Sequence, residues 1–270
     1  MDIQQQKRYN VVLIGDCCSD IYHYGKCERL SPEAPVPVLK ETKRVVLPGM
    51  SWNVRLNMES LGGFVLHYTN TEKINKHRFI DSKYNQHLLR WDEGEHQSIQ
   101  PINTNILHTT TVPDVVVISD YNKGFLPPEA CKEIIRYYKE LDVNIPIFVD
   151  TKKVDLSCFE GVFIKINEKE YESIEVFPEN SQFIVTLGEK GTRYKDVVFP
   201  TNVVEVFDVC GAGDVFLSTL AYTYLRDKSI PSAIRCANKL ASISVSHMGT
   251  YVITKDDVDE MLKGTYDLRF

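Results

Sequence analysis

Several patterns that would assign a protein to a class at once are missing from this sequence of 270 residues. No apolar run approaches the roughly 18 residues that a membrane-spanning helix needs, and the opening MDIQQQKRYN lacks the apolar region of a signal peptide. Basic and aromatic residues do not alternate in a stripe, and the net charge is −6. Neither a nucleic acid nor a membrane surface is therefore an expected partner, and we expect a cytoplasmic globular protein.

The cysteines and histidines show no spacing that is typical of a metal site. The seven cysteines form no C-x-x-C pair, and the seven histidines include no H-E-x-x-H. A zinc site is therefore not expected. An odd number of scattered cysteines predicts free, mostly buried thiols in a reducing compartment.

Short apolar runs rich in β-branched residues recur along the chain and predict strands buried on both faces of a parallel sheet. Amphipathic stretches lie between them, and residues 127–142 and 230–249 predict helices. This alternation predicts an α/β doubly wound fold. Without internal repeats or a low-complexity linker, we expect residues 1–270 to form a single domain. The predicted strands are residues 11–15, 115–119, 145–150, 162–167 and 183–188.

Two segments, at about residues 20–46 and 76–104, have a different pattern. Their apolar and polar residues alternate, and prolines and charges interrupt them. This pattern predicts short antiparallel strands. We expect them to form a small β flap against the main sheet.

The segment VVEVFDVCGAGDVFLSTLAYTYL, residues 203–225, predicts a strand, a glycine turn and a helix. The chain lacks G-x-x-x-x-G-K-[ST], which excludes a P-loop, and GAGDVF has only two glycines of the dinucleotide fingerprint. The backbone N–H groups of Gly211, Ala212 and Gly213 can nevertheless converge on an anion. Asp214 follows directly. It either caps the helix or takes a proton from a hydroxyl while these N–H groups hold a phosphoryl group.

Polar residues and glycines gather at the carboxyl ends of the predicted strands, where open α/β sheets bind ligands. Asp16 and Asp20 follow the first strand, where two carboxylates can grip the hydroxyls of a polyol; the alternative for each is a turn with a local hydrogen bond. Asn53, one turn into a predicted helix, can face the same crevice. The other positions of this kind are Asp120, Tyr121 and Lys123 after one strand, Asn167 and Glu170 after another, and Thr186 and Gly188 after a third.

Over essentially its full length the chain resembles the ribokinase-type (PfkB) carbohydrate kinases. DVCGAGD looks like the D-T-x-G-A-G-D signature of that family, and the N-terminal Gly-Asp-x-x-x-Asp, the Asn-x-x-Glu at 167–170 and VTLGEKG support it. Within the family, the chain is similar to the bacterial D-glycero-D-manno-heptose 7-phosphate kinases of ADP-heptose synthesis, an early part of lipopolysaccharide formation. The stretches that carry this likeness are GDCCSDIYHYGKCERLSPEAPVPVLK, NQHLLRWD, SDYNKG, VDTKK and MGT.

The resemblance implies a ribokinase-like three-layer sandwich with a mostly parallel central sheet and a small β lid. It implies phosphoryl transfer from ATP to the anomeric hydroxyl of a sugar phosphate, with Mg²⁺, and leaves a monovalent-cation requirement open. Asp214 would be the base that deprotonates the sugar hydroxyl. The anion hole for the γ-phosphoryl group would comprise Gly211, Ala212 and Gly213, and Mg²⁺ would be organised through water by Asn167 and Glu170.

The same resemblance implies where the two substrates bind. The nucleotide pocket would be lined by Thr186, Gly188 and Asn238. Sugar hydroxyls would meet Asp16, Asp20 and Asn53, while Asp120 and Lys123 would lie near the substrate, with Lys123 able to meet a phosphate. The lid often supplies a dimer contact in this family, so a homodimer is expected.

The sequence departs from the family pattern at three places. Met50 stands where a second glycine is usual, which narrows the expected sugar site, and Cys210 replaces a small hydroxyl residue or valine. The family usually has a further strand and helix after the position of Gly63, and here only a short segment intervenes. Two alternatives therefore stay open: a kinase for another sugar or sugar phosphate, and a catalytically inactive sugar- or nucleotide-binding homologue.

Overall fold

An eight-stranded sheet forms the centre of the protein, in a computed structural model that describes residues 8–109, 112–202 and 205–266. The strand order is β12-β11-β10-β9-β8-β7-β1-β4. The strands from β10 to β4 are parallel, and β11 and β12 pair antiparallel at one end. The strands are β1 (Asn10–Gly15), β4 (Phe64–Tyr68), β7 (Val115–Asp120), β8 (Ile147–Thr151), β9 (Phe163–Asn167), β10 (Gln182–Thr186), β11 (Thr192–Tyr194) and β12 (Val197–Phe199).

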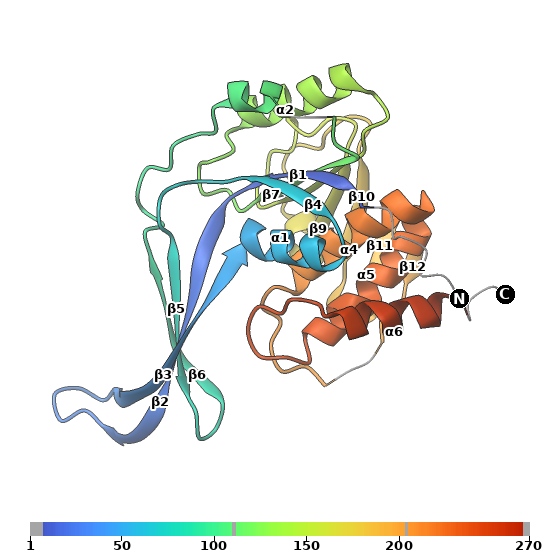
Figure 1. Cartoon of the computed structure of the whole chain (residues 1–270). Helices are drawn as coiled ribbons and strands as arrows, with labels where there is room; N and C mark the ends of the chain where they lie inside the picture. The colour runs from blue at the N-terminus through green and yellow to red at the C-terminus, as the bar shows by residue number, and fades with distance from the viewer. Residues whose placement is uncertain (1–7, 110–111, 203–204, 267–270) are drawn as a thin grey trace.

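Helices cover both faces of this sheet (Figure 1). Helices α1, α4, α5 and α6 pack on one face and α2 packs on the other. No helix among residues 8–109, 112–202 and 205–266 combines the length and apolarity needed to cross a membrane. The helices are α1 (Ser51–Ser60), α2 (Pro128–Leu141), α3 (Glu168–Glu172), α4 (Ala212–Asp227), α5 (Ile230–Ser244) and α6 (Lys255–Tyr266), with 3₁₀ turns at Thr104–Thr109 and Gly188–Lys190.

The central strands are buried on both faces, which explains their continuous apolar sequences. On β1, Val11 and Leu13 enter the core shared with α1, α4, α5 and α6, whereas Val12 and Ile14 enter the core shared with α2. All four are at most 2% exposed. The expected three-layer, mostly parallel architecture is therefore confirmed.

A second sheet forms the lid, and Figure 1 shows it projecting from the main body. Its order is β3-β2-β5-β6. The expected flap exists, but two details of the prediction were wrong. The strands β2 and β3 have 14 residues each and are not short, and the central β2–β5 pair is parallel. The lid strands are β2 (Cys17–Leu30), β3 (Pro37–Met50), β5 (Asn75–Asp81) and β6 (Gln86–Glu93).

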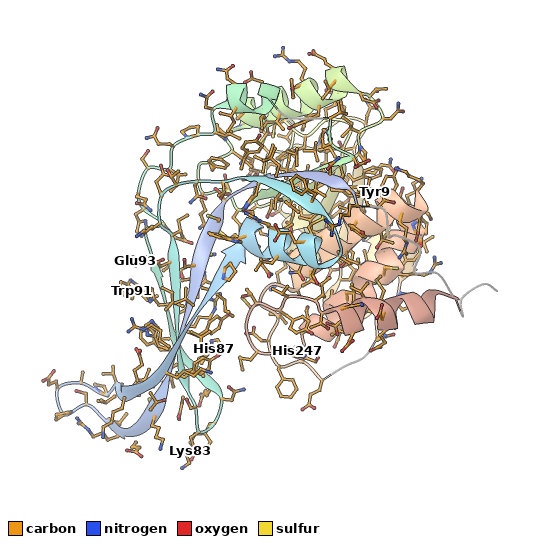
Figure 2. The ribbon with its side chains drawn as sticks, in the orientation of Figure 1. Tyr9, Lys83, His87, Trp91, Glu93 and His247 are labelled. Atoms are coloured by element: carbon orange, nitrogen blue, oxygen red, sulfur yellow. The ribbon has the colours of Figure 1, made fainter. Side chains whose placement is uncertain are left out.

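The lid has two different faces because side chains alternate along its strands. Asp20, Tyr22, Lys76 and Arg78 are buried toward the body. We call the opposite side the outer lid face; its apolar members are Ile21, Val46, Phe79, Leu89 and Trp91, which adjoin one another through the strand register. Figure 2 shows Trp91 pointing away from the helices of the body.

Two further expectations about local structure were wrong. The helix predicted for residues 230–249 ends at Ser244. There the hydroxyls of Ser244 and Ser246 bond to the carbonyls of Ala241 and Ile243, which favours the end of a helix. The strand predicted before the glycine turn is not formed at residues 205–210, where Val209 is 70% exposed; residues 203–204 lie outside the described residues.

Candidate active site

Asp214 lies at the start of α4, next to the glycine turn. Its Oδ2 accepts a hydrogen bond from Asn53 Nδ2 (3.1 Å) and its Oδ1 accepts one from the Tyr121 hydroxyl (2.8 Å). The N-cap of α4 is Gly211. The alternative in which Asp214 caps this helix is therefore wrong. Its side chain is 3% exposed. The chain thus brings together three polar groups from three distant segments.

The glycine turn needs Gly211 for two reasons. Its φ of 78° lies in the left-handed region, which side chains disfavour. A Cβ at this position would also lie 2.7 Å from Asn53 Nδ2. Gly211 therefore allows the turn and the Asn53–Asp214 hydrogen bond to exist together.

The surroundings of Asp214 favour a carboxyl group that titrates near neutrality. Burial raises its pKa to about 6, although the hydrogen bonds from Tyr121 and Asn53 favour the ionised form. Asp150 adds to the increase and Lys165 opposes it. A carboxylate with this pKa is ionised at pH 7 and still basic enough to accept a proton.

A pocket of about 790 Å³ opens beside Asp214. It lies at the carboxyl ends of β8, β9 and β10, where ligands of such sheets bind. Val206, Val209 and Phe216 give it apolar walls. Of the residues singled out from the sequence, those that line it are Asn167, Thr186, Gly188, Asn238 and the turn Gly211, Ala212, Gly213, together with Asp214 and Tyr121.

Asn238 has a structural task in the wall of this pocket. Its Oδ1 accepts from the Thr192 hydroxyl (2.6 Å), and its Nδ2 donates to the carbonyls of Phe199 (2.9 Å) and Pro200 (3.2 Å). The amide therefore ties α5 to β11 and to the end of β12.

Asn167 and Glu170 form a reciprocal capping box at the start of α3. Asn167 Oδ1 accepts from the Glu170 N–H, and Glu170 Oε2 accepts from the Asn167 N–H, each at 2.9 Å. The other oxygen of Glu170 pairs with Lys152. Both residues thus have a local role in the fold, and Asn167 still lines the pocket.

Three charged residues that the sequence did not predict as site residues, Asp150, Lys152 and Lys165, line the pocket beside the glycine turn. Asp150 is bound by Lys165 (2.6 Å) and Lys152 (3.4 Å). Burial alone would raise the pKa of Asp150, but the two ammonium groups hold it below its usual value. A Cβ on Gly213 would lie 2.9 Å from Lys165 Nζ. The sequence feature that could have marked Lys165 as a site residue is its position inside the apolar run VFIKIN.

The residues assigned to the sugar lie on the lid side of Asp214. Asp16 Oδ2 accepts from the backbone N–H groups of Tyr121 (2.8 Å) and Lys123 (3.4 Å), while Oδ1 is buried without a hydrogen-bond partner among the described residues. Burial, with a smaller contribution from the charge of Asp120, raises the pKa of Asp16 to about 6. Of the two carboxyl groups assigned to the sugar, Asp16 therefore has a buried oxygen without a hydrogen-bond partner among the described residues.

Asp120 and Lys123 are both paired within the protein. Asp120 Oδ2 accepts from Thr151 Oγ1 (2.6 Å) and Lys153 Nζ (2.7 Å). Lys123 pairs with Glu95 at 2.8 Å. These contacts fix the loop after β7.

Arg78, which the sequence pattern did not predict as a site residue, links the lid to the glycine turn. It pairs with Asp20, and its Nη2 donates to Cys210 Sγ (3.4 Å). The Tyr22 hydroxyl also approaches Cys210 Sγ (3.8 Å). Burial raises the pKa of Cys210 to about 11, so the group is a thiol at neutral pH. The lid therefore contacts the segment that carries Asp214.

The fold is ribokinase-like. An Arabidopsis thaliana ribokinase complexed with ribose and ATP matches 95% of this chain and 99% of its own with a TM-score of 0.67 and 16% identity. Escherichia coli phosphofructokinase-2 in complex with potassium matches 96% of this chain and 99% of its own with a TM-score of 0.72 and 15% identity. At these identities the likeness concerns the fold alone.

Residues 113–257 match the family described as pfkB family carbohydrate kinase. The chain belongs to this family and is a kinase. The "Bifunctional protein HldE" of Campylobacter jejuni subsp. jejuni serotype O:6 is 32% identical over 96% of this chain and 66% of its own length. The Granulibacter bethesdensis protein of the same name is 28% identical over 92% of this chain and 64% of its own length. The chain thus spans about two thirds of the length of these relatives.

Proposed function

We propose that this kinase transfers the γ-phosphoryl group of ATP to the anomeric hydroxyl of D-glycero-D-manno-heptose 7-phosphate, in the cytoplasm. One observation carries the reaction type: Asp214 is held by Asn53 and Tyr121 directly beside the glycine turn and the pocket. The likeness to HldE proteins supports the choice of sugar. The seven free cysteines fit a reducing compartment.

In the proposed reaction, ionised Asp214 accepts the proton of the attacking hydroxyl. The N–H groups of Gly211, Ala212 and Gly213 hold the phosphoryl group during transfer, at the positive end of the α4 dipole. Lys165 Nζ lies close to Gly213 and is paired with Asp150, so it offsets the negative charge of that carboxylate beside the phosphoryl group. These groups position the reactants and stabilise negative charge, which is most of what phosphoryl transfer requires from a protein.

ATP would occupy the pocket lined by Thr186, Gly188 and Asn238. Among the described residues no group of three or more His, Cys, Asp or Glu could enclose a metal ion. Mg²⁺ would keep most of its water ligands and would bind together with the phosphates of ATP. Asn167 and Glu170 would contact the ion through these waters. When bound, Mg²⁺ would neutralise charge on the phosphates.

The sugar would bind between the lid and the carboxyl end of β1. Asp16, with its unused Oδ1, and Asp20 would accept hydrogen bonds from sugar hydroxyls, and Asn53 would border the same space. Lys123 would meet the phosphate of the sugar after leaving Glu95. Asp120 would act by holding the loop that carries Lys123.

Asp214→Asn tests the proposal. We expect this variant to bind ATP and the sugar almost as the wild type does, but to lose at least about a hundredfold in kcat, because a positioned base contributes about 10²–10⁴ in rate. ATP turnover with heptose 7-phosphate, fructose 6-phosphate and ribose is the measurement, and a Mg²⁺ series with Glu170→Gln tests the cation role in the same assay.

A matched control is Asp257→Asn, which makes the same change in the first turn of α6. It should keep wild-type turnover. Equal rates for wild type and Asp214→Asn on every sugar would reject the catalytic role. A higher rate with fructose 6-phosphate or ribose than with heptose 7-phosphate would assign a different substrate to the kinase. A wild type that is inactive on all three sugars would favour a binding protein.

A further inference from the structure

Both oxygens of Asp214 are already occupied in the ligand-free protein. Asn53 Nδ2 and the Tyr121 hydroxyl hold one oxygen each, and only 3% of the residue is exposed. A general base must lie within hydrogen-bond reach of the hydroxyl that it deprotonates. Each carboxylate oxygen can accept a second hydrogen bond, but a residue that is 3% exposed and covered by two donors leaves no open approach for an acceptor. One of the two partners therefore has to move when an acceptor binds.

Asn53 is fixed in its place. It is fully buried on α1, and its Oδ1 and its carbonyl both accept from Asn57 Nδ2 (3.1 and 2.9 Å). Asn57 Oδ1 in turn accepts from the Ile253 N–H (2.9 Å). The Gly211 turn closes directly over the Asn53 amide. Displacing Asn53 would disturb the packing of α1 against α4.

The side chain of Tyr121 is held by fewer hydrogen bonds than that of Asn53: it packs against the core on the α2 side of the sheet, and its hydroxyl donates to Asp214. Tyr121 is the first residue after β7, it is partly exposed, and it lines the pocket. Asp16 binds its backbone N–H at 2.8 Å, which fixes the main chain but not the ring. The ammonium groups of Lys76, from the lid, and of Lys152, from the end of β8, lie 5.5 and 5.6 Å from the centre of the ring.

We propose that Tyr121 is a positioning residue that gates the base: its hydroxyl occupies the place of the acceptor hydroxyl on Asp214 Oδ1 and leaves when the acceptor binds. The inference rests on the proposed function, in which Asp214 is the base. Without an acceptor, the phenol keeps Asp214 oriented and keeps water away from Oδ1. With an acceptor, the sugar hydroxyl takes over the same hydrogen bond.

Tyr121→Phe separates the two states, because the ring and its lysine contacts remain while the hydroxyl is lost. The acid limb of kcat/KM reports the free enzyme, and that of kcat reports the enzyme with its substrates bound. We expect the limb of kcat/KM to move up by about one pH unit, since a hydrogen bond to the carboxylate is lost. The limb of kcat should stay, and KM for the acceptor should fall severalfold.

Other titratable groups surround this contact, and the variant changes none of them. Asp16, whose pKa is also raised, keeps its bond to the backbone of residue 121. Tyr251→Phe is the matched control, because it removes a Tyr–Asp hydrogen bond (2.7 Å, to Asp257) outside the pocket and should move neither limb. The remaining neighbours are Cys18, Lys76, Asp150, Lys152 and Lys165.

Two outcomes overturn the gate: a shift of both limbs, in which case the tyrosine stays bonded throughout, and a shift of neither. If Asp214→Asn turns over like the wild type, the proposed function fails instead. In that case carboxyl ¹³C NMR still tests whether the Tyr121 hydroxyl leaves Asp214. The pH midpoint of the Asp214 titration should differ between the wild type and Tyr121→Phe in the free proteins, and should be the same in both when heptose 7-phosphate is saturating. A difference that persists with the sugar bound, or no difference in the free proteins, refutes the gate.

Discussion

Asp214 is a carboxylate that the fold makes costly to ionise. Its burial removes water, and the hydrogen bonds from Asn53 and Tyr121 compensate only in part, so its pKa rises from 3.8 to about 6. A carboxyl group with a raised pKa binds its proton more tightly in the folded than in the unfolded chain. The fold therefore loses stability as the pH rises from about 4 to above 6.

Replacing this group should stabilise the protein while it removes activity. At pH 8, Asp214→Asn is expected to raise the free energy of unfolding by about 1–3 kcal/mol, because a shift of one pKa unit corresponds to about 1.4 kcal/mol. The gain should shrink as the pH falls from 6 to 4 and approach zero below about pH 3, where the wild-type group is protonated in both the folded and the unfolded chain. Urea unfolding across this pH range measures it.

The control variant Asp257→Asn is expected to change the free energy of unfolding in the opposite direction. The pKa of Asp257 lies below its usual value, because hydrogen bonds from Thr254 and Tyr251 outweigh its burial. Asp257→Asn should therefore destabilise the fold at pH 8. An Asp214→Asn protein that is less stable than the wild type at pH 8 would show that the two hydrogen bonds outweigh the cost of burying the charge.

At the scale of elements, the entrance to α1 carries an unusual residue. Met50 has φ 56° and ψ −134°, a conformation that favours glycine. Its side chain is only 3% exposed and packs in the core with Ile14, Cys18 and Ile74. The side chain thus fills the core beneath the lid, and its burial offsets the strain of the backbone.

This arrangement reverses the usual order of two substitutions. Met50→Gly should be less destabilising than Met50→Ala by about 1 kcal/mol, because alanine loses the same burial but keeps the strained backbone. At Met58, fully buried in the last turn of α1, glycine should be worse than alanine by about 1 kcal/mol. Urea unfolding of the four variants measures both differences, and the same order at both positions would contradict the strain at Met50.

The sequence predicted the buried strands well, because a run such as residues 115–119 is apolar on both faces and has few other stable environments. It also predicted Asp214 beside a glycine turn. It did not predict that β2 pairs parallel with β5, because the direction of pairing depends on where the partner strand arrives. Lys165 and Arg78 escaped notice for a similar reason, since their partners Asp150 and Asp20 are distant in sequence.

At the scale of the whole molecule, the outer lid face has no cover within the described chain. Val46 is 59% exposed, Leu89 60% and Trp91 50%, and the three lie on one side of one sheet. Exposed apolar groups gathered in this way mark an interaction surface more often than scattered ones do. We propose that a second copy of the chain covers them, which would make the enzyme a homodimer through its lid.

Trp91→Lys tests this assembly. We expect the wild type to sediment as a dimer and the variant as a monomer at micromolar concentration, because a charge in the middle of an apolar interface is left without a partner. Trp52, the only other tryptophan, is 45% exposed on α1, so Trp52→Lys is a matched control that should remain dimeric. A monomeric wild type in sedimentation velocity would refute the proposal.

The hydrogen bond between Asn53 and Asp214 spans 161 residues of chain. A ribosome that adds about 5–20 residues per second needs roughly 8–32 seconds to make that stretch. Before the glycine turn and the carboxylate are made, the lid strands, α1 and all the strands of the central sheet have already been synthesised. On the proposed function, a nascent chain that ends before Gly211 lacks both the anion hole and the base, so it would not yet consume ATP.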